Sequence, residues 1–173
     1  MRSVREENIM EHSQQVAMFA HSLAVINNKV FGGHADANKT VLYALYHECA
    51  EVLTGDLPTP IKYFNSSIKG AYKNIEERAC DKLLSTLPEE LEGEFSSALK
   101  PDQSSYEYTL MKAADRLSAY VKCLEELRCG NKEFEKAKKS IEADLKKRNL
   151  PEVNYFFEKF IEGYNLTLDD LDI

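Results

Sequence analysis

Apolar residues recur at helical spacing along nearly the whole chain, and the alternating pattern of a half-buried strand is almost absent. In the first such stretch His12, Val16, Phe19 and Leu23 follow the i, i+4, i+7, i+11 spacing that places side chains on one face of a helix. Clusters of glycine, proline and asparagine separate the periodic stretches. The pattern predicts an all-α protein that folds as one compact helical bundle.

The breaks between the periodic stretches set the expected helix boundaries. Asp36 is an N-cap residue for the second helix, and Gly55 is a natural signal for its C-terminal end. The sequence GDLPTP that follows contains two prolines, which remove backbone donors and predict a stiff loop. The expected helices cover residues 3–27, 36–53, 62–87, 88–99, 105–129, 132–149 and 152–164.

Length and composition narrow the class of protein. With 173 residues, 43% of them hydrophobic, the chain suffices for one core and predicts a single domain over residues 1–173. A net charge of −7 without a basic cluster argues against nucleic acid as the main partner, because contacts to phosphates need a basic surface. Four cysteines without the spacing of a disulfide framework, and a charged start without a signal-peptide pattern, predict a cytoplasmic protein. No apolar run approaches the roughly 18 residues of a membrane span, so no membrane partner is expected.

The segment YHECAEVLTG carries more ionisable groups than a core helix needs. If it is one helix, His47 and Glu51 share a face at i and i+4, and Glu48 is turned by about 100°. His12 begins the apolar stripe of the first helix, which aims its imidazole inward. Asp115 lies among small and apolar residues, where an unpaired carboxylate would be costly to bury. A divalent metal ion would satisfy both imidazoles and the carboxylates of Glu48 and Asp115 together.

Simpler interpretations of these residues stay open from spacing alone. A histidine on an apolar face is commonly a hydrogen-bonded core residue. Asp115 has possible ion-pair partners in Arg116 and Lys112, and Glu48 and Glu51 are by default solvated charges of an exposed helix face.

Three segments in a fixed order give the chain a family resemblance. VREENIMEHSQQVAMFAHSLA, LYALYHECAEVLTGDLPTPIKYFN and KAADRLSAYVKCLEEL closely resemble the bacterial 5'-deoxynucleotidases of the HD-domain phosphohydrolase superfamily, and the similarity runs through essentially the whole chain. That superfamily is named for a His-Asp pair that holds a divalent metal ion together with an upstream His and a downstream Asp. The resemblance implies an HD-type helical bundle.

The resemblance also implies roles for particular residues. Glu51 matches the catalytic carboxylate. The implied metal ligands are His12, His47, Glu48 and Asp115, with Glu48 where the family has Asp. The implied substrate contacts are His12, Asp56, Leu57, Pro58, Thr59 and Asp115.

The activity implied is metal-dependent hydrolysis, with Co²⁺, Mn²⁺ or a similar ion, of deoxyribonucleoside 5'-monophosphates to deoxynucleosides and phosphate, by a homodimer. Two departures from the family motivate alternatives. Glu48 replaces Asp, and the further N-terminal helix with an Arg-Trp pair that orients the phosphate is expected to be missing. A nucleotide-binding helical module with weakened catalysis is therefore one alternative. An HD-type hydrolase of nucleoside triphosphates or cyclic nucleotides is another.

Overall fold

The computed structural model describes residues 2–57, 59–62 and 64–170, and these residues form helices and connecting segments without a β-strand. The prediction of an all-α protein is confirmed. No helix within the described part of the chain is both long enough and apolar enough to cross a membrane.

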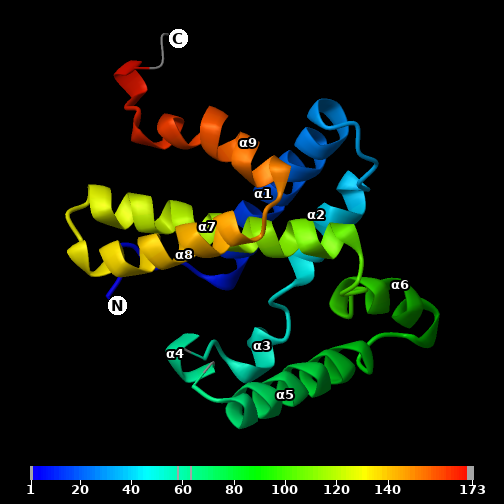
Figure 1. The fold of residues 1–173 in the computed structure, drawn as a ribbon. Helices are drawn as coiled ribbons and strands as arrows, with labels where there is room; N and C mark the ends of the chain where they lie inside the picture. The colour runs from blue at the N-terminus through cyan, green and yellow to red at the C-terminus, as the bar shows by residue number, and fades with distance from the viewer. Residues whose placement is uncertain (1, 58, 63, 171–173) are drawn as a thin grey trace.

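Five helices build the main bundle, with the core between them (Figure 1). α1 packs against α2 and α7, α9 lies on α1, and α8 lies along α7. Val16, Phe19 and Leu23 of α1 are buried, as the spacing predicted, and they meet buried side chains of α7 such as Leu117. The bounds are α1 (Ile9–Val30), α2 (Ala37–Tyr46), α7 (Tyr106–Arg128), α8 (Glu135–Lys147) and α9 (Pro151–Lys159).

A second group of helices lies to one side of this bundle, at the bottom of Figure 1. α5 contacts the short helices α3 and α4 and the following α6, and α6 contacts α2. The hydroxyl of Tyr72 on α5 donates a hydrogen bond to the carbonyl of Gly55 at 3.0 Å, which ties α5 to the end of α3. The bounds are α3 (Glu51–Thr54), α4 (Thr59–Lys62), α5 (Ser66–Leu84) and α6 (Glu89–Leu99).

The start of the first helix was predicted too early. The side chain of Asn8 caps α1 by accepting hydrogen bonds from the amides of Met10 and Glu11, so the helix begins at Ile9 and not at residue 3. The preceding segment is extended, and the carboxylate of Glu126 on α7 accepts a hydrogen bond from the amide of Val4 at 2.9 Å. This long-range contact replaces the helical hydrogen bonds that were expected there.

The expected helix over residues 36–53 is interrupted. Asp36 caps α2, and Gly55, with φ of 69°, follows α3, as predicted. Between these ends, residues 47–50 form turns in which the amides of Cys49 and Glu51 bond to carbonyls three residues back. This tighter ladder, typical of 3₁₀ geometry, breaks the α-helix at His47.

The other boundaries shift by a few residues, and two connections differ in kind. Part of the expected GDLPTP loop is the short helix α4, and α5 begins at Ser66 because Asn65 caps it. The helix expected over residues 132–149 opens with the 3₁₀ turn η1 (Lys132–Phe134). The last expected helix ends as α9 and continues as the 3₁₀ segment η2 (Ile161–Asn165), followed by η3 (Leu168–Asp170).

Candidate metal centre

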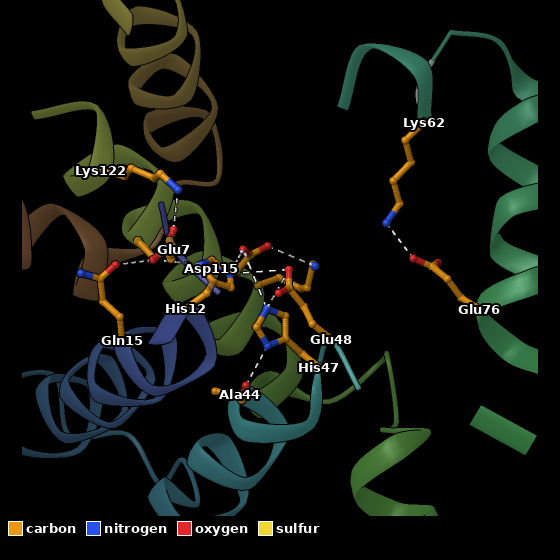
Figure 2. A network of polar contacts seen from close by, with 12 residues as sticks. Glu7, His12, Gln15, Ala44, His47, Glu48, Lys62, Glu76, Asp115 and Lys122 are labelled. Carbon is orange, nitrogen blue, oxygen red and sulfur yellow. Dashed lines mark hydrogen bonds and ion pairs between the residues drawn. The ribbon is translucent and has the colours of Figure 1, made fainter. Parts of the chain in front are cut away.

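Three ligand-type side chains from distant parts of the chain meet on one side of the bundle (Figure 2). His12 comes from the first turn of α1, His47 from the turn that ends α2, and Asp115 from the middle of α7. One ligand atom of each lies within 4.8 Å of those of the other two. The mutual packing of α1, α2 and α7 therefore produces the convergence that spacing along the chain suggested.

The distances within the cluster suit a shared cation. The Oδ1 atom of Asp115 lies 3.5 Å from Nε2 of His12 and 4.0 Å from Nε2 of His47. The Oε1 atom of Glu48 lies 3.6 Å and 3.7 Å from the same two nitrogens. Ligands about 2.1 Å from one ion lie at most about 4.2 Å apart, and these four nitrogen–oxygen distances lie within that limit. The residues whose ligand atoms all lie within 4.8 Å of one another are His12, His47 and Asp115.

The hydrogen-bonding state of the two imidazoles supports the same conclusion. The Nε2 atoms of His12 and His47 are buried and have no hydrogen-bond partner. Nδ1 of His47 lies 2.7 Å from the carbonyl oxygen of Ala44. A carbonyl only accepts, so Nδ1 carries the proton and the lone pair of Nε2 points into the cluster. Two unpartnered nitrogens facing two carboxylates fit a divalent metal ion.

The protonation states follow from burial and from the neighbouring charges. Burial lowers the pKa of His47 to about 4, which keeps this imidazole neutral at pH 7. Burial alone would raise the pKa of Asp115, but the neighbouring His12, Lys112 and His47 together lower it below its usual range. Asp115 is therefore an ionised carboxylate inside the fold. Burial raises the pKa of Glu48.

His12 differs from His47 in the direction of its pKa shift. Burial alone would lower its pKa, but Asp115, Glu48 and Glu7 outweigh burial and raise the pKa above its usual value. Because a metal ion needs the neutral imidazole, protons and a metal ion would compete for His12.

The break in the helix at His47 changes the directions in which the side chains of Glu48 and Glu51 point. In a continuous helix His47 and Glu48 would diverge by about 100°, yet both reach the cluster from the turn. Glu51 instead opens α3, and the i, i+4 relation expected between His47 and Glu51 assumed a helix that is not continuous. Burial raises the pKa of Glu51 to about 7, with help from the charges of Glu48 and Asp56, so Glu51 and Asp56 share the electrostatic environment of the cluster.

The loop expected to contact the nucleotide is described in part. Asp56 is exposed and Leu57 half-buried in the segment that follows α3. Pro58 lies outside the described residues, and Thr59 is described only by its backbone, as the first residue of α4.

Two more residues lie beside the cluster, and one of them, Lys112, was expected from the sequence as a possible partner of Asp115. Nζ of Lys112 lies 3.3 Å from Oδ2 of Asp115, so one of the ion pairs weighed as an alternative is formed, whereas Arg116 pairs with Asp144. The pairing of Asp115 is thus not an alternative to the cluster, because its two oxygens face different partners. The i, i+3 spacing of Lys112 and Asp115 was the signal available for this contact.

Glu7 also lies beside the cluster and was not expected from the sequence. Its Oε1 atom lies 3.9 Å from Nδ1 of His12, on the side of the ring away from the cluster, and its Oε2 atom accepts from Nζ of Lys122 at 2.6 Å (Figure 2). Glu7 precedes the helix, so no helical periodicity pointed to it.

The fold and the cluster of two His and two carboxylates define an HD-domain phosphohydrolase. A crystal structure of an HD-domain phosphohydrolase from Listeria innocua matches 98% of this chain and 82% of that chain with a TM-score of 0.83, at 21% sequence identity. A family model described as 5'-deoxynucleotidase YfbR-like matches residues 1–164. Proteins named 5'-deoxynucleotidase YfbR from Escherichia coli O1:K1 / APEC and O45:K1 (strain S88 / ExPEC) are 51% identical over 174 residues, covering 99% of this chain and 86% of each relative. The chain belongs to the YfbR-like 5'-deoxynucleotidase family.

Proposed function

We propose that this protein is a metal-dependent phosphatase that hydrolyses deoxyribonucleoside 5'-monophosphates to deoxynucleosides and phosphate. The observation that carries the proposal is the meeting of two buried, unpartnered imidazole nitrogens with two carboxylates, in a chain 51% identical to proteins named 5'-deoxynucleotidase. The family model spans residues 1–164, which supports treating the chain as one HD-type domain.

His12, His47, Glu48 and Asp115 would hold the ion. Mixed nitrogen and oxygen ligands suit first-row divalent ions, and Co²⁺ or Mn²⁺ is the proposed choice. When bound, such an ion supplies positive charge for phosphate oxygens and makes a water acidic enough to act as a nucleophile near neutral pH. Glu48 in place of the family's Asp supplies the same ligand group on a longer arm, and its oxygen lies as near to the imidazoles as that of Asp115 does.

Glu51 would act as the general base. A base works best when its pKa lies near the working pH, and the pKa of Glu51 is raised to about 7. In this role the carboxylate would orient the attacking water and take its proton as the water oxygen bonds to phosphorus. The bond from phosphorus to the 5'-oxygen breaks, and that oxygen gains a proton to give the free deoxynucleoside.

The segment after α3 is the proposed site for the sugar. Asp56, next to Gly55 at the end of α3, would accept a hydrogen bond from the 3'-hydroxyl of a deoxyribose. Leu57, Pro58 and Thr59 continue the segment, and a close wall there would exclude a 2'-hydroxyl. His12 and Asp115 would contact the phosphate beside the ion.

Phosphate release is the test. The protein with Mn²⁺ or Co²⁺ should release phosphate from dAMP and dTMP, more slowly from AMP, and not after treatment with EDTA. Replacement His47→Ala should abolish both activity and stoichiometric metal binding, while an exposed control such as Lys146→Ala should change neither. Metal-dependent hydrolysis of dATP or of a cyclic nucleotide in preference to dAMP would favour a different substrate class. Tight binding of dAMP without turnover would favour a nucleotide-binding module.

Two further features belong to the proposal. Exposed apolar side chains on α1, among them Met10 and Met18, support a homodimer, and sedimentation that finds only a 19.7 kDa species at micromolar concentration would contradict it.

All four cysteines are free thiols, which supports a reducing compartment such as the cytoplasm. Recovery of the protein with periplasmic contents after osmotic shock would contradict that location.

A further inference from the structure

A cavity of about 330 Å³ adjoins the candidate metal centre. His47 and Ala50 form part of its wall, together with Tyr108, Met111 and Lys112 of α7. The opposite wall comes from α5. A volume of this size is large enough for a small ligand, and the presence of His47 in the wall means that such a ligand would lie against the metal centre.

The acids of the α5 wall already have lysine partners. Glu76 accepts from Lys62 at 2.7 Å, on the side of Figure 2 away from the cluster. Glu77 lies 3.7 Å from Lys73, and Asp81 pairs with Lys100. Within each pair the two charges neutralise each other. Among the described residues, these three pairs therefore give the α5 wall of the cavity no net positive charge.

Lys112 is different, because its partner is a candidate metal ligand. Its ammonium group lies 3.3 Å from Oδ2 of Asp115, while Oδ1 of the same carboxylate faces the two imidazoles. The side chain of Lys112 keeps 40% of its surface exposed, against 23% for Asp115. The ammonium group therefore stands where the cavity and the metal centre meet, and part of it is open to a ligand.

The charge of the centre calls for such a group. Glu48, Glu51, Asp56 and Asp115 bring up to four negative charges to a region that would also receive a phosphate dianion, and a divalent ion offsets only two of them. Once the carboxylate of Asp115 is committed to an ion, its attraction for Lys112 weakens. The ammonium group is then free to pair with the phosphate.

We propose that Lys112 binds the phosphate group of the substrate at the junction of this cavity and the metal centre. This inference rests on the proposed function, because a phosphate is assigned to the centre only there. It makes Lys112 a substrate-binding residue rather than a support for Asp115. Inorganic phosphate, the expected product, would occupy the same position.

The experiment compares Lys112→Gln with two other variants. Lys112→Arg keeps the positive charge, and Lys73→Gln removes one lysine charge from the same cavity wall. Calorimetric titration of inorganic phosphate into the Mn²⁺-loaded protein, titration of Mn²⁺ into the metal-free protein, and steady-state kinetics with dAMP are measured for each. Lys112→Gln should weaken phosphate binding by about 10- to 100-fold, the usual effect of losing a hydrogen bond to a charged group. It should raise KM for dAMP similarly and change the affinity for Mn²⁺ less than threefold. Lys112→Arg should recover most of the loss, and Lys73→Gln should change phosphate binding less than twofold.

Three results would overturn the inference. Unchanged phosphate affinity in Lys112→Gln would show that Lys112 does not contact the phosphate. An equal loss of phosphate affinity in Lys73→Gln would show that the effect comes from the overall charge of the cavity and not from a specific contact. A parallel loss of Mn²⁺ affinity in Lys112→Gln would show that the lysine only positions Asp115. Failure of the proposed function would give a different result: the wild-type protein would not hydrolyse dAMP. Calorimetry could still show that it binds phosphate and that Lys112→Gln weakens this binding.

Discussion

The pH dependence of catalysis is the sharpest consequence of the charges around Glu51. This carboxylate is partly buried beside Glu48 and Asp56, which together with burial raise its pKa to about 7. A general base acts in its ionised form, so activity must rise with pH as Glu51 loses its proton. Replacement Glu51→Gln keeps the shape of the side chain and removes the titrating group.

The size of the effect follows from that pKa. With a pKa of about 7, roughly one tenth of Glu51 is ionised at pH 6 and about nine tenths at pH 8, so kcat/KM should rise by at most about tenfold across this interval. A bound divalent cation favours the ionised carboxylate and moves the midpoint to lower pH, never to higher. In Glu51→Gln the rate should fall by about 10² to 10⁴, and the rise should disappear.

The assay is phosphate release from dAMP between pH 5.5 and 8.5. Mn²⁺ must be saturating at every pH, because protons also compete with the ion for His12. Calorimetry on the variant at pH 7.5 controls for metal loss. A variant that retains its ion and shows the same pH profile as the wild-type protein, or a rate within tenfold of it, would refute the role of Glu51.

Three further predictions concern the surroundings of the centre and its coupling to the fold. Glu7→Gln should weaken Mn²⁺ binding by about tenfold, because it removes the negative charge 3.9 Å from Nδ1 of His12; calorimetry that finds equal affinity would contradict it. Gly33→Ala should lower the free energy of unfolding by about 1–3 kcal/mol. The added methyl group would collide with the side chain of Asn27 and so disturb the hydrogen bond that Asn27 donates to the fully buried carboxylate of Glu152. An unchanged urea midpoint would rule this out. Removal of the metal should lower stability by about 2.7 kcal/mol relative to protein in Mn²⁺ at 100 times the Kd, and a melting temperature insensitive to EDTA would exclude coupling of the ion to folding.

The fold could largely be predicted from the sequence, because helical periodicity and helix caps are local sequence signals. The stripe Val16, Phe19 and Leu23 is buried as the spacing predicted, and the caps Asp36 and Gly55 lie at the ends where their chemistry placed them. The start of α1 could also have been predicted, since Asn8 is a good N-cap residue immediately before the apolar residues Ile9 and Met10.

The details of the site were less predictable, because tertiary contacts decide them. Apolar residues continue at helical spacing on both sides of His47. No local sequence signal predicts the turn at His47, which brings the side chain of Glu48 to the cluster. The extended segment at Val4 is held by Glu126, more than a hundred residues away. The sequence does contain Lys112 three positions before Asp115, but only the tertiary structure shows that Lys112 also lines a cavity shared with residues of α5.

The distribution of unsatisfied polar atoms argues that the centre is made for an external ligand rather than for the fold. Elsewhere buried polar side chains find partners: Thr40 bonds to the carbonyl of Asp36 at 2.7 Å, and Ser118 bonds to Gln15 at 2.5 Å. Among the described residues, three buried side-chain nitrogen or oxygen atoms lack a hydrogen-bond partner, and two of them are the Nε2 atoms of His12 and His47, which both face the carboxylates of Glu48 and Asp115. Leaving a buried donor or acceptor unpaired costs about 1–3 kcal/mol, so a chain selected for stability alone would not leave two at one point. The cost is recovered when an ion accepts both lone pairs, and stability and ion binding then become one equilibrium.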